Sequence, residues 1–123
     1  MDYSIFAKKA TAQDKRNIFK KFDGNIDIVP DEIKPFYRNF NPIDVEIDVD
    51  GVGVRFCSAE WLHNLQNDYA YLKAQFIFAS CNSDPIFINN GQVYTCPHGA
   101  KEPEWEKLAD NFEIYLTSLI DTV

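Results

Sequence analysis

The sequence predicts a single α+β domain in which helices flank a twisted antiparallel sheet built from hairpins. Three observations lead to this prediction: apolar residues have helical spacing towards both ends of the chain, two turn-forming dipeptides are each flanked by strand-like segments, and a wholly apolar run lies between them. The 123 residues have the usual size of one domain and can bury a core without disulfides or metal. We therefore assign residues 1–123 to one domain.

Two helical segments are predicted before the sheet. Residues 2–22 are rich in Ala, Lys and Gln, and the apolar residues near the end of this segment have helical spacing: Ile18, Phe19 and Phe22. A second helix should begin at Pro30, because a proline followed by two acids suits a first helical turn. Pro35 is expected to kink or restart this helix.

The clearest local pattern is a hairpin centred on Asp50-Gly51, a dipeptide preferred in two-residue turns. Apolar and acidic residues alternate through 43–49, and a second strand should follow at 52–56. The pairs expected on the apolar side are Val45 with Phe56, Ile47 with Val54, and Val49 with Val52. On the other side Glu46 should lie opposite Arg55 as an opposite-charge pair.

Two later segments should complete the sheet. Residues 75–79 are apolar on both sides of a strand, so this strand is expected to be central. A second hairpin should run through 85–96 around the turn Asn90-Gly91, with Ile88 facing Val93 and Phe87 facing Tyr94.

Two more helices are expected around these strands. Ser58 can cap a short helix that carries Trp61. An amphipathic helix that begins near Pro103 or Asn111 should close the chain and cover the sheet. Its apolar residues, at steps of three and four, are Trp105, Leu108, Ala109, Phe112, Leu116, Leu119 and Ile120.

The charge of the chain limits the classes of partner that it can bind. The chain has 12 Lys and Arg against 19 Asp and Glu, a formal net charge of −7. Binding to nucleic acid or to an anionic membrane depends on basic groups, so we expect no nucleic acid and no membrane among its partners. A basic protein would instead be attracted. The same charge would also serve solubility alone.

The sequence favours a cytoplasmic protein. Its first residues lack the apolar run of a signal peptide, and no later segment is long and apolar enough to span a bilayer. Cys57, Cys81 and Cys96 are odd in number and have no CxxC spacing, whereas secreted domains of this size usually pair their cysteines. We interpret Cys57 and Cys81 as core thiols, because they lie in or beside apolar strands.

Candidate partner contacts are an acidic ladder and two tryptophans. The acidic ladder consists of Asp44, Glu46, Asp48 and Asp50. These carboxylates follow one strand face, which would suit either a cationic partner or a solvated face that protects a sheet edge. Trp61 and Trp105 fit either a core or an interface, and the charged neighbours of Trp105 favour its partial exposure.

No catalytic apparatus is recognised, and no cofactor is expected. Zinc could in principle draw on Cys81, Cys96, His63 and His98, but short paired ligand spacings are missing. Asp84 and His98 suggest an acid/base pair, yet no Ser, Cys or Lys nucleophile stands in a recognisable context near them. Gly-rich phosphate loops, HExxH and GxSxG motifs are also missing.

A series of short motifs runs through most of the chain: Val29-Pro30-Asp31-Glu32-Ile33 with Phe36-Tyr37, then Asn41 to Ile47, Asp84 to Tyr94, His98, and Leu108 to Leu116. In order and spacing this series resembles the SUKH superfamily, the Smi/Knr-like family. Its members commonly show an Ile-Pro helix motif, a Gly-Asp-Pro-like hairpin entry, a Gly-x-Val-Tyr strand, a His and a closing Ala-x-Ser-Phe-x-x-Phe/Tyr-Leu helix. The chain departs from that pattern at Ser83, Pro35 and Asn111.

The resemblance implies a SUKH-like fold without enzymatic activity. Bacterial members are commonly immunity proteins that bind and neutralise a cognate toxin, often a nuclease. We therefore expect a protein-binding module, monomeric or weakly dimeric. A nuclease toxin has a basic groove that an acidic strand face could occupy. The expected partner contacts are Asp44, Glu46, Asp48, Trp61 and Asp84.

Two alternatives remain open at this point. Other members of the family are regulatory, so the chain could be a regulatory or scaffold protein without a toxin partner. A third possibility is a small hydrolase or metal-binding protein that uses Cys96, His98 and Asp84.

Overall fold

The predicted α+β architecture is confirmed in a computed structural model that describes residues 2–70, 72, 75–99 and 103–120. The helices in this described part are α1 (Tyr3–Gln13), α2 (Lys34–Asn39), α3 (Leu62–Asp68) and α4 (Phe112–Ile120), with short 3-10 helices η1 (Asp31–Ile33) and η2 (Ala59–Trp61) before α2 and α3. The strands are β1 (Phe19–Lys20), β2 (Asn41–Pro42), β3 (Val45–Val49), β4 (Val52–Phe56), β5 (Phe76–Cys81), β6 (Asp84–Asn89), β7 (Gln92–Thr95) and β8 (Glu106–Ala109).

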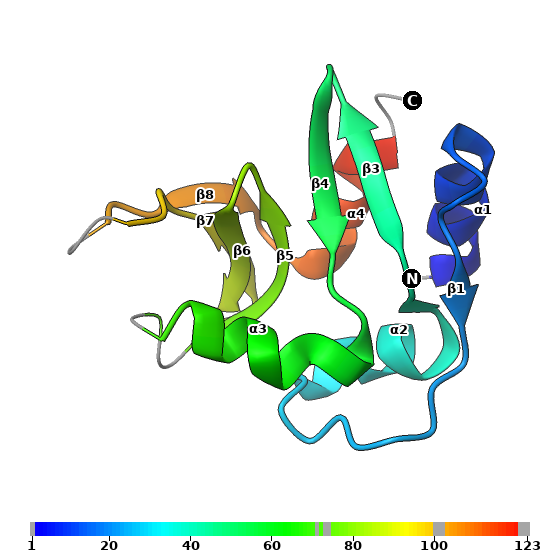
Figure 1. Cartoon of the computed structure of the whole chain (residues 1–123), viewed down its shortest axis with the longest axis horizontal. Helices are drawn as coiled ribbons and strands as arrows, with labels where there is room; N and C mark the ends of the chain where they lie inside the picture. The colour runs from blue at the N-terminus through cyan, green and yellow to red at the C-terminus, as the bar shows by residue number, and fades with distance from the viewer. Residues whose placement is uncertain (1, 71, 73–74, 100–102, 121–123) are drawn as a thin grey trace.

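Six of these strands form one antiparallel sheet in the order β3-β4-β5-β6-β7-β8, so β5 lies inside the sheet as expected. The strands β1 and β2 form a separate antiparallel pair. Figure 1 shows that the large sheet is curled: the β3–β4 hairpin stands beside α1 and in front of α4, and β5–β8 turn away from it. Helix α3 contacts β5 from another side.

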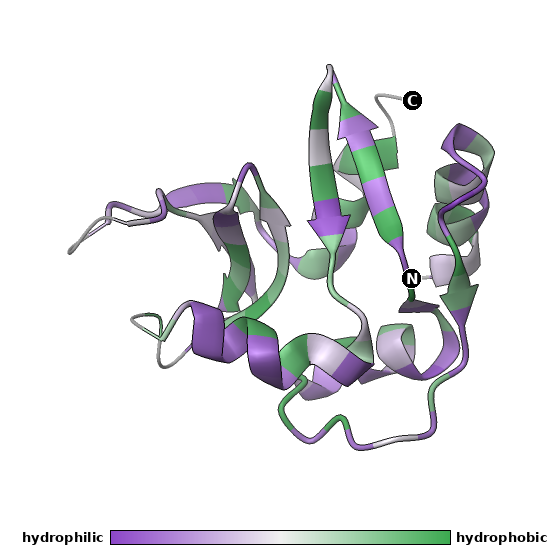
Figure 2. Ribbon diagram, viewed as in Figure 1, coloured by the Kyte–Doolittle hydropathy of each residue, from purple (hydrophilic) through white to green (hydrophobic). Residues whose placement is uncertain are grey.

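Both predicted hairpins are confirmed, residue pair by residue pair. Asp50 and Gly51 have φ angles of 53° and 85°, and Asn90 and Gly91 have 50° and 79°, as a two-residue turn with two positive φ angles requires. Figure 2 shows the alternation of hydrophobic and hydrophilic residues along β3. Glu46 lies opposite Arg55 as predicted.

The main core is a cluster of aromatic rings between the sheet and the helices α1, α2 and α4. Phe36 is fully buried at its centre, and its ring packs against Tyr3 and Phe112 in edge-to-face geometry, with centroid distances of 5.2 and 5.3 Å. Phe78 on β5 packs against Phe112 in the same way at 5.1 Å. Edge-to-face pairs of this kind add to the hydrophobic gain from burial.

A smaller core lies on the other face of β5 and β6. It consists of Leu72, Ile77, Phe87 and Cys96, with Leu65, Tyr69 and Tyr94 packed around it. Strand β5 therefore buries Phe76 and Phe78 in the main core and Ile77 in the smaller one. This arrangement explains why the strand is apolar on both sides.

The prediction of a helix over residues 2–22 is wrong at its end. Helix α1 stops at Gln13, and Asp14 has extended backbone angles. Phe19 lies in β1 and packs edge-to-face on Phe6 at 5.9 Å, while Ile18 is exposed. The helical spacing of these apolar residues was accidental, because tertiary contacts hold this segment in an extended form.

Of the two predicted starts of the closing helix, the start at Asn111 is confirmed and the start at Pro103 is not. The helix begins after Asn111, whose side-chain oxygen accepts a hydrogen bond from the Ile114 N–H at 2.8 Å. Trp105 lies outside this helix, and Leu108 lies in β8, where the neighbouring Ala109 pairs with Val93 of β7. The apolar residues of β8 therefore continue the helical spacing of α4 by chance, although they belong to a strand.

Two smaller expectations concern helix starts. The second helix does restart at Pro35, since η1 ends at Ile33 and Pro35 lies in the first turn of α2. The cap of the third helical segment differs from the prediction: Ser58 makes no side-chain capping bond. The Ala59 N–H instead donates to the buried Asn41 side chain at 2.7 Å, so a residue 18 positions away provides the cap.

Three side-chain amides take the place of missing neighbouring strands. The outer edge of β3 is bonded by Asn17, which accepts from Glu46 N–H at 2.9 Å and donates to its carbonyl at 3.1 Å. Gln13 bonds both backbone groups of Asp48 in the same way, at 2.8 and 3.0 Å. On α3, Gln66 bonds both backbone groups of Ile77 at 2.8 and 2.7 Å. The backbone N–H and C=O groups of these strand residues thus have hydrogen-bond partners although no further strand pairs with them.

We expect Asn17→Ala to destabilise the fold by about 2–4 kcal/mol, because it leaves the half-buried N–H and C=O of Glu46 without partners and removes one of the two hydrogen bonds to the Ala10 carbonyl, which keeps the Asp14 N–H at 3.2 Å. Asn17 is 3% exposed and also donates to the Ala10 carbonyl at 2.8 Å. The matched variant Gln13→Ala should cost less than about 1 kcal/mol, since water can reach the Asp48 backbone. Urea denaturation measures both; equal losses would contradict the assigned role of Asn17.

Candidate protein-binding surfaces

The acidic ladder lies along the edge strand β3, with Asp44 in the bend before the strand and Asp50 in the turn after it. Asp44 and Asp48 are exposed, whereas Glu46 is half-buried. Contrary to the expected pairing of Arg55 with Glu46, the Arg55 guanidinium donates to Asp44 at 3.3 Å. The pKa of Arg16 is raised mainly by its hydrogen bonds with Asp14, and further by the nearby carboxylates of Asp44 and Glu46.

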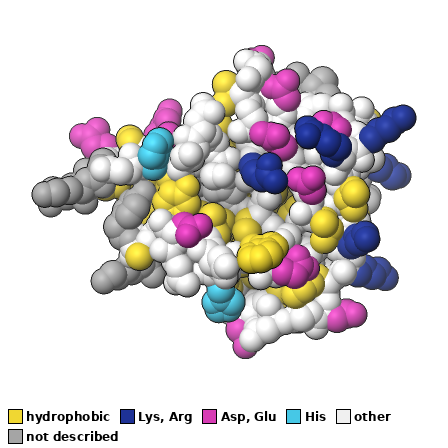
Figure 3. Space-filling model, in the orientation of Figure 1, with side chains coloured by type: hydrophobic (Ala, Val, Ile, Leu, Met, Phe, Trp, Pro, Cys, Tyr) yellow, Lys and Arg dark blue, Asp and Glu magenta, His cyan; other side chains and the backbone are white. Residues whose placement is uncertain are grey.

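The ladder is therefore interspersed with basic groups. Figure 3 shows this face of the molecule, where Lys and Arg side chains lie between Asp and Glu side chains over and beside the hairpin. The backbone edge of β3 is also closed by Gln13 and Asn17. These contacts fit the interpretation of a solvated, protected edge better than that of a uniformly acidic docking face.

A hollow of about 310 Å³ brings two predicted contacts, Asp44 and Trp61, together. We call it the Trp61 hollow; it is lined by Ile43, Asp44, Arg55, Phe56, Cys57, Ser58, Trp61, Leu65, Ala79 and Ser80. Trp61 ends η2 and is 62% exposed, whereas the next residue, Leu62, is buried in the core. Ile43 is 41% exposed, so two large apolar side chains meet solvent around one hollow.

The thiol in this hollow is poorly suited to nucleophilic chemistry. Burial chiefly raises the pKa of Cys57 to about 12, and the carboxylates of Glu60 and Asp68 add to this effect. A thiol with such a pKa stays protonated near neutral pH, while the thiolate is the reactive form. Cys57 is half-buried against the main core, in partial agreement with its interpretation as a core thiol.

The fifth predicted contact, Asp84, lies apart from the Trp61 hollow. It lines a separate hollow of about 300 Å³ together with Val54 and Cys81. These two residues face away from Arg55 and Ser80, their neighbours along β4 and β5, because side chains alternate along a strand. The structure therefore brings Asp44 and Trp61 together but places Asp84 on the opposite face of the sheet.

Asp84 forms the pair with His98 that the sequence suggested. One carboxylate oxygen accepts from the His98 backbone N–H at 2.9 Å and lies 2.6 Å from its Nδ1. These hydrogen bonds lower the pKa of Asp84. Burial raises the pKa of the neighbouring Cys81 and of Cys96, which makes both thiols weak nucleophiles. The two hydrogen bonds of this pair hold the segment after β7 against the first residue of β6.

We expect Asp84→Asn to reduce stability by about 0.5 kcal/mol near pH 7, because both groups are partly exposed and water screens the pair. The folded-state pKa of Asp84 is lowered, so its contribution is present above its unfolded pKa and is lost as the pH falls through the folded value. The two proteins should thus converge in stability at about pH 2. Urea denaturation at both pH values measures this, with Asp23→Asn at an exposed position outside the helices and strands as the control.

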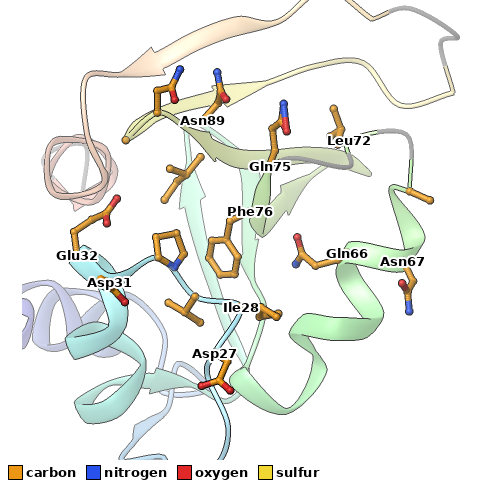
Figure 4. A pocket seen from close by; sticks show the side chains of 16 residues that line it. Asp27, Ile28, Asp31, Glu32, Gln66, Asn67, Leu72, Gln75, Phe76 and Asn89 are labelled. Carbon is orange, nitrogen blue, oxygen red and sulfur yellow. The ribbon is translucent and has the colours of Figure 1, made fainter.

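A hollow much larger than the Trp61 hollow contains none of the predicted contact residues. This groove has a volume of about 920 Å³ and lies between the 27–32 segment, α3, β5 and the β6–β7 turn. Figure 4 shows Phe76 in its middle, Gln66 pointing in from α3, and Asp27, Asp31 and Glu32 along the side formed by the 27–32 segment. We call it the acidic groove.

The acidic groove continues into a hollow of about 420 Å³. The two share Glu32, Ile88, Asn90 and Gly91. The second hollow adds carboxylates from the loop and helix after β8: Asp110 and Glu113. Lys34 bonds Asp31 at 2.7 Å, and Lys107 bonds Asp110.

Sequence reasoning missed this groove. The sequence pattern indicates Asp31 and Glu32 only as carboxylates that favour a helix start, and both lie in the first turn of η1. A signal was present, because Asp27, Asp31 and Glu32 fall within six positions that contain no Lys or Arg. Its meaning depended on the distant residues Phe76 and Ile88, which complete the groove.

The comparisons with known proteins identify no relative. Family models, curated proteins and solved structures yielded no match to this chain. Within the described residues, no cluster of His, Cys, Asp and Glu is arranged to hold a metal ion. No described helix combines the length and the hydrophobicity needed to cross a membrane.

Proposed function

We propose that this chain is a non-enzymatic protein-binding module, an immunity protein of the cytoplasm that binds and neutralises a cognate bacterial toxin. The observation that supports a binding role is the Trp61 hollow. An exposed Trp beside an exposed Ile around a concave surface, bordered by charged side chains, has the composition of an interface hot spot.

The contacts expected from this surface have distinct roles. The Trp61 indole supplies a large apolar surface with few rotatable bonds, and Ile43 extends it. Asp44 and Arg55 form an exposed ion pair at the edge, so either group can turn to a partner at little cost. Glu46 and Asp48 lie farther along β3 and would contribute long-range attraction rather than direct anchoring.

The toxin as partner follows from the resemblance to the SUKH superfamily, and a nuclease toxin would suit the net charge of −7. The molecule is expected to act as a monomer or weak dimer. A regulatory or scaffold protein of the same family would use the same hollow for another partner. Co-expression with the toxin encoded beside its gene separates these roles: unchanged toxicity with every neighbouring toxin contradicts the immunity function.

We expect Trp61→Ala to weaken partner binding at least about 30-fold, the loss typical of a central interface Trp. The change should leave the fold stable, because the side chain is 62% exposed. Protection in co-expression and affinity by calorimetry both measure the effect.

Trp105→Ala is the matched control, since it removes the same side chain from a 40%-exposed position that does not line the hollow. It should bind the partner like the unmodified protein. Equal binding by the Trp61→Ala variant would contradict the assignment of the hollow as the main contact.

A further inference from the structure

We propose that the acidic groove is a second binding site, which receives a basic peptide segment of a protein partner whose Lys or Arg residues alternate with apolar ones. This inference does not require that the partner be a toxin. The groove and the Trp61 hollow share no lining residue, so the two sites can be tested separately.

The floor of the groove provides an apolar surface. Phe76 and Ile88 are 7% and 6% exposed and belong to the main core, which fixes their positions. Ile28 and Pro30 are half-buried beside them. Aliphatic side chains of a peptide could cover the exposed parts of Ile28 and Pro30 and remove this apolar surface from water, at about 25 cal/mol per Å².

The described walls of the groove are acidic, and only part of this charge is paired with described basic side chains. Among the described residues that line the groove and its continuation, there is no Lys, Arg or His. Asp31 and Asp110 have lysine partners outside the lining, whereas Asp27 and Glu32 have no ion-pair partner in the described part of the chain. The acidic ladder differs, because Arg55 and Arg16 lie among its carboxylates. Charge complementarity therefore favours the groove as the site for a basic segment.

The polar groups of the groove suit a peptide backbone. Asn67 is exposed on α3, and Asn89 and Asn90 lie at the β6–β7 turn, so carboxamide donors and acceptors are present on two walls. Gln66 is already bonded to Leu62 and Ile77 and serves as a fixed wall. The continuation past Glu32 gives the groove an elongated course, which fits an extended segment better than a compact ligand.

Nuclear magnetic resonance with synthetic peptides tests this proposal. The probe is Ac-GRLGRLGRLG-amide, added to ¹⁵N-labelled protein at low salt. We expect chemical-shift changes concentrated at the groove, with Ile28, Glu32 and Asn90 among the affected residues, and weaker binding as salt is added. A peptide with Glu in place of Arg should not bind, and one with Gly in place of Leu should bind about tenfold more weakly.

The double variant Asp27→Asn/Glu32→Gln should weaken binding of the Arg-Leu peptide about tenfold. These two exposed side chains make no described ion pair, so the fold should survive the change. The control Asp44→Asn/Asp48→Asn removes the same charge from the acidic ladder and should change the affinity less than about twofold.

Equal weakening by the two double variants, or shift changes concentrated on β3, would overturn the groove as the site. Absence of binding by the Arg-Leu peptide, or equal binding of the Glu-Leu peptide, would also overturn it. The Trp61→Ala variant should bind the peptide normally. A loss of toxin protection in that variant therefore concerns only the proposed function, and a loss of peptide binding in the groove variant concerns only this inference.

Discussion

The fold depends on side-chain amides that satisfy strand backbones where no neighbouring strand is present. Asn17 and Gln13 close the outer edge of β3, and Gln66 bonds Ile77 where β4 no longer runs beside β5. Backbone groups left unpaired inside a protein are costly, so these bonds decide where the sheet can end. Because Gln66 bonds the backbone of Ile77, strand β4 can end at Phe56 without leaving these backbone groups of β5 unpaired.

The Trp61 hollow and the acidic groove both form because the chain turns away from the sheet at the end of β4. After Phe56 the chain runs into η2 and α3, and the Gln66 bonds hold α3 against β5. Trp61 and Leu65 on this helical segment line one hollow, whereas Gln66 and Asn67 line the acidic groove. One short helical segment thus forms a wall of each site, and its tether to β5 keeps both walls in place.

The parts of the fold that could be predicted were those coded locally. A turn dipeptide with two positive φ angles and an alternation of period two fix a hairpin within about a dozen residues, as around Asp50-Gly51. The segment around Phe19 could not be predicted in this way, because the bonds of Asn17 to a strand 29 residues away overrode its helical spacing. Strand β8 was missed for a similar reason, since its pairing with β7 is not visible in its own sequence.

The value of a carboxylate as a binding group could likewise not be predicted from local sequence, because it depends on cations from distant segments. The carboxylates of β3 stand out in the sequence because they are regularly spaced. Their attraction for a basic partner is reduced, however, by Arg16 and Arg55, which other segments of the chain bring close to them. Among the described residues, Asp27 and Glu32 have no ion-pair partner, yet the sequence pattern indicates only a helix start at Glu32. A carboxylate attracts a basic partner in proportion to the charge left after local pairing, because the fields of a paired cation and anion largely cancel at distances much greater than their separation. The unpaired carboxylates of the acidic groove would therefore attract a basic segment more strongly than the more regular but partly paired ladder.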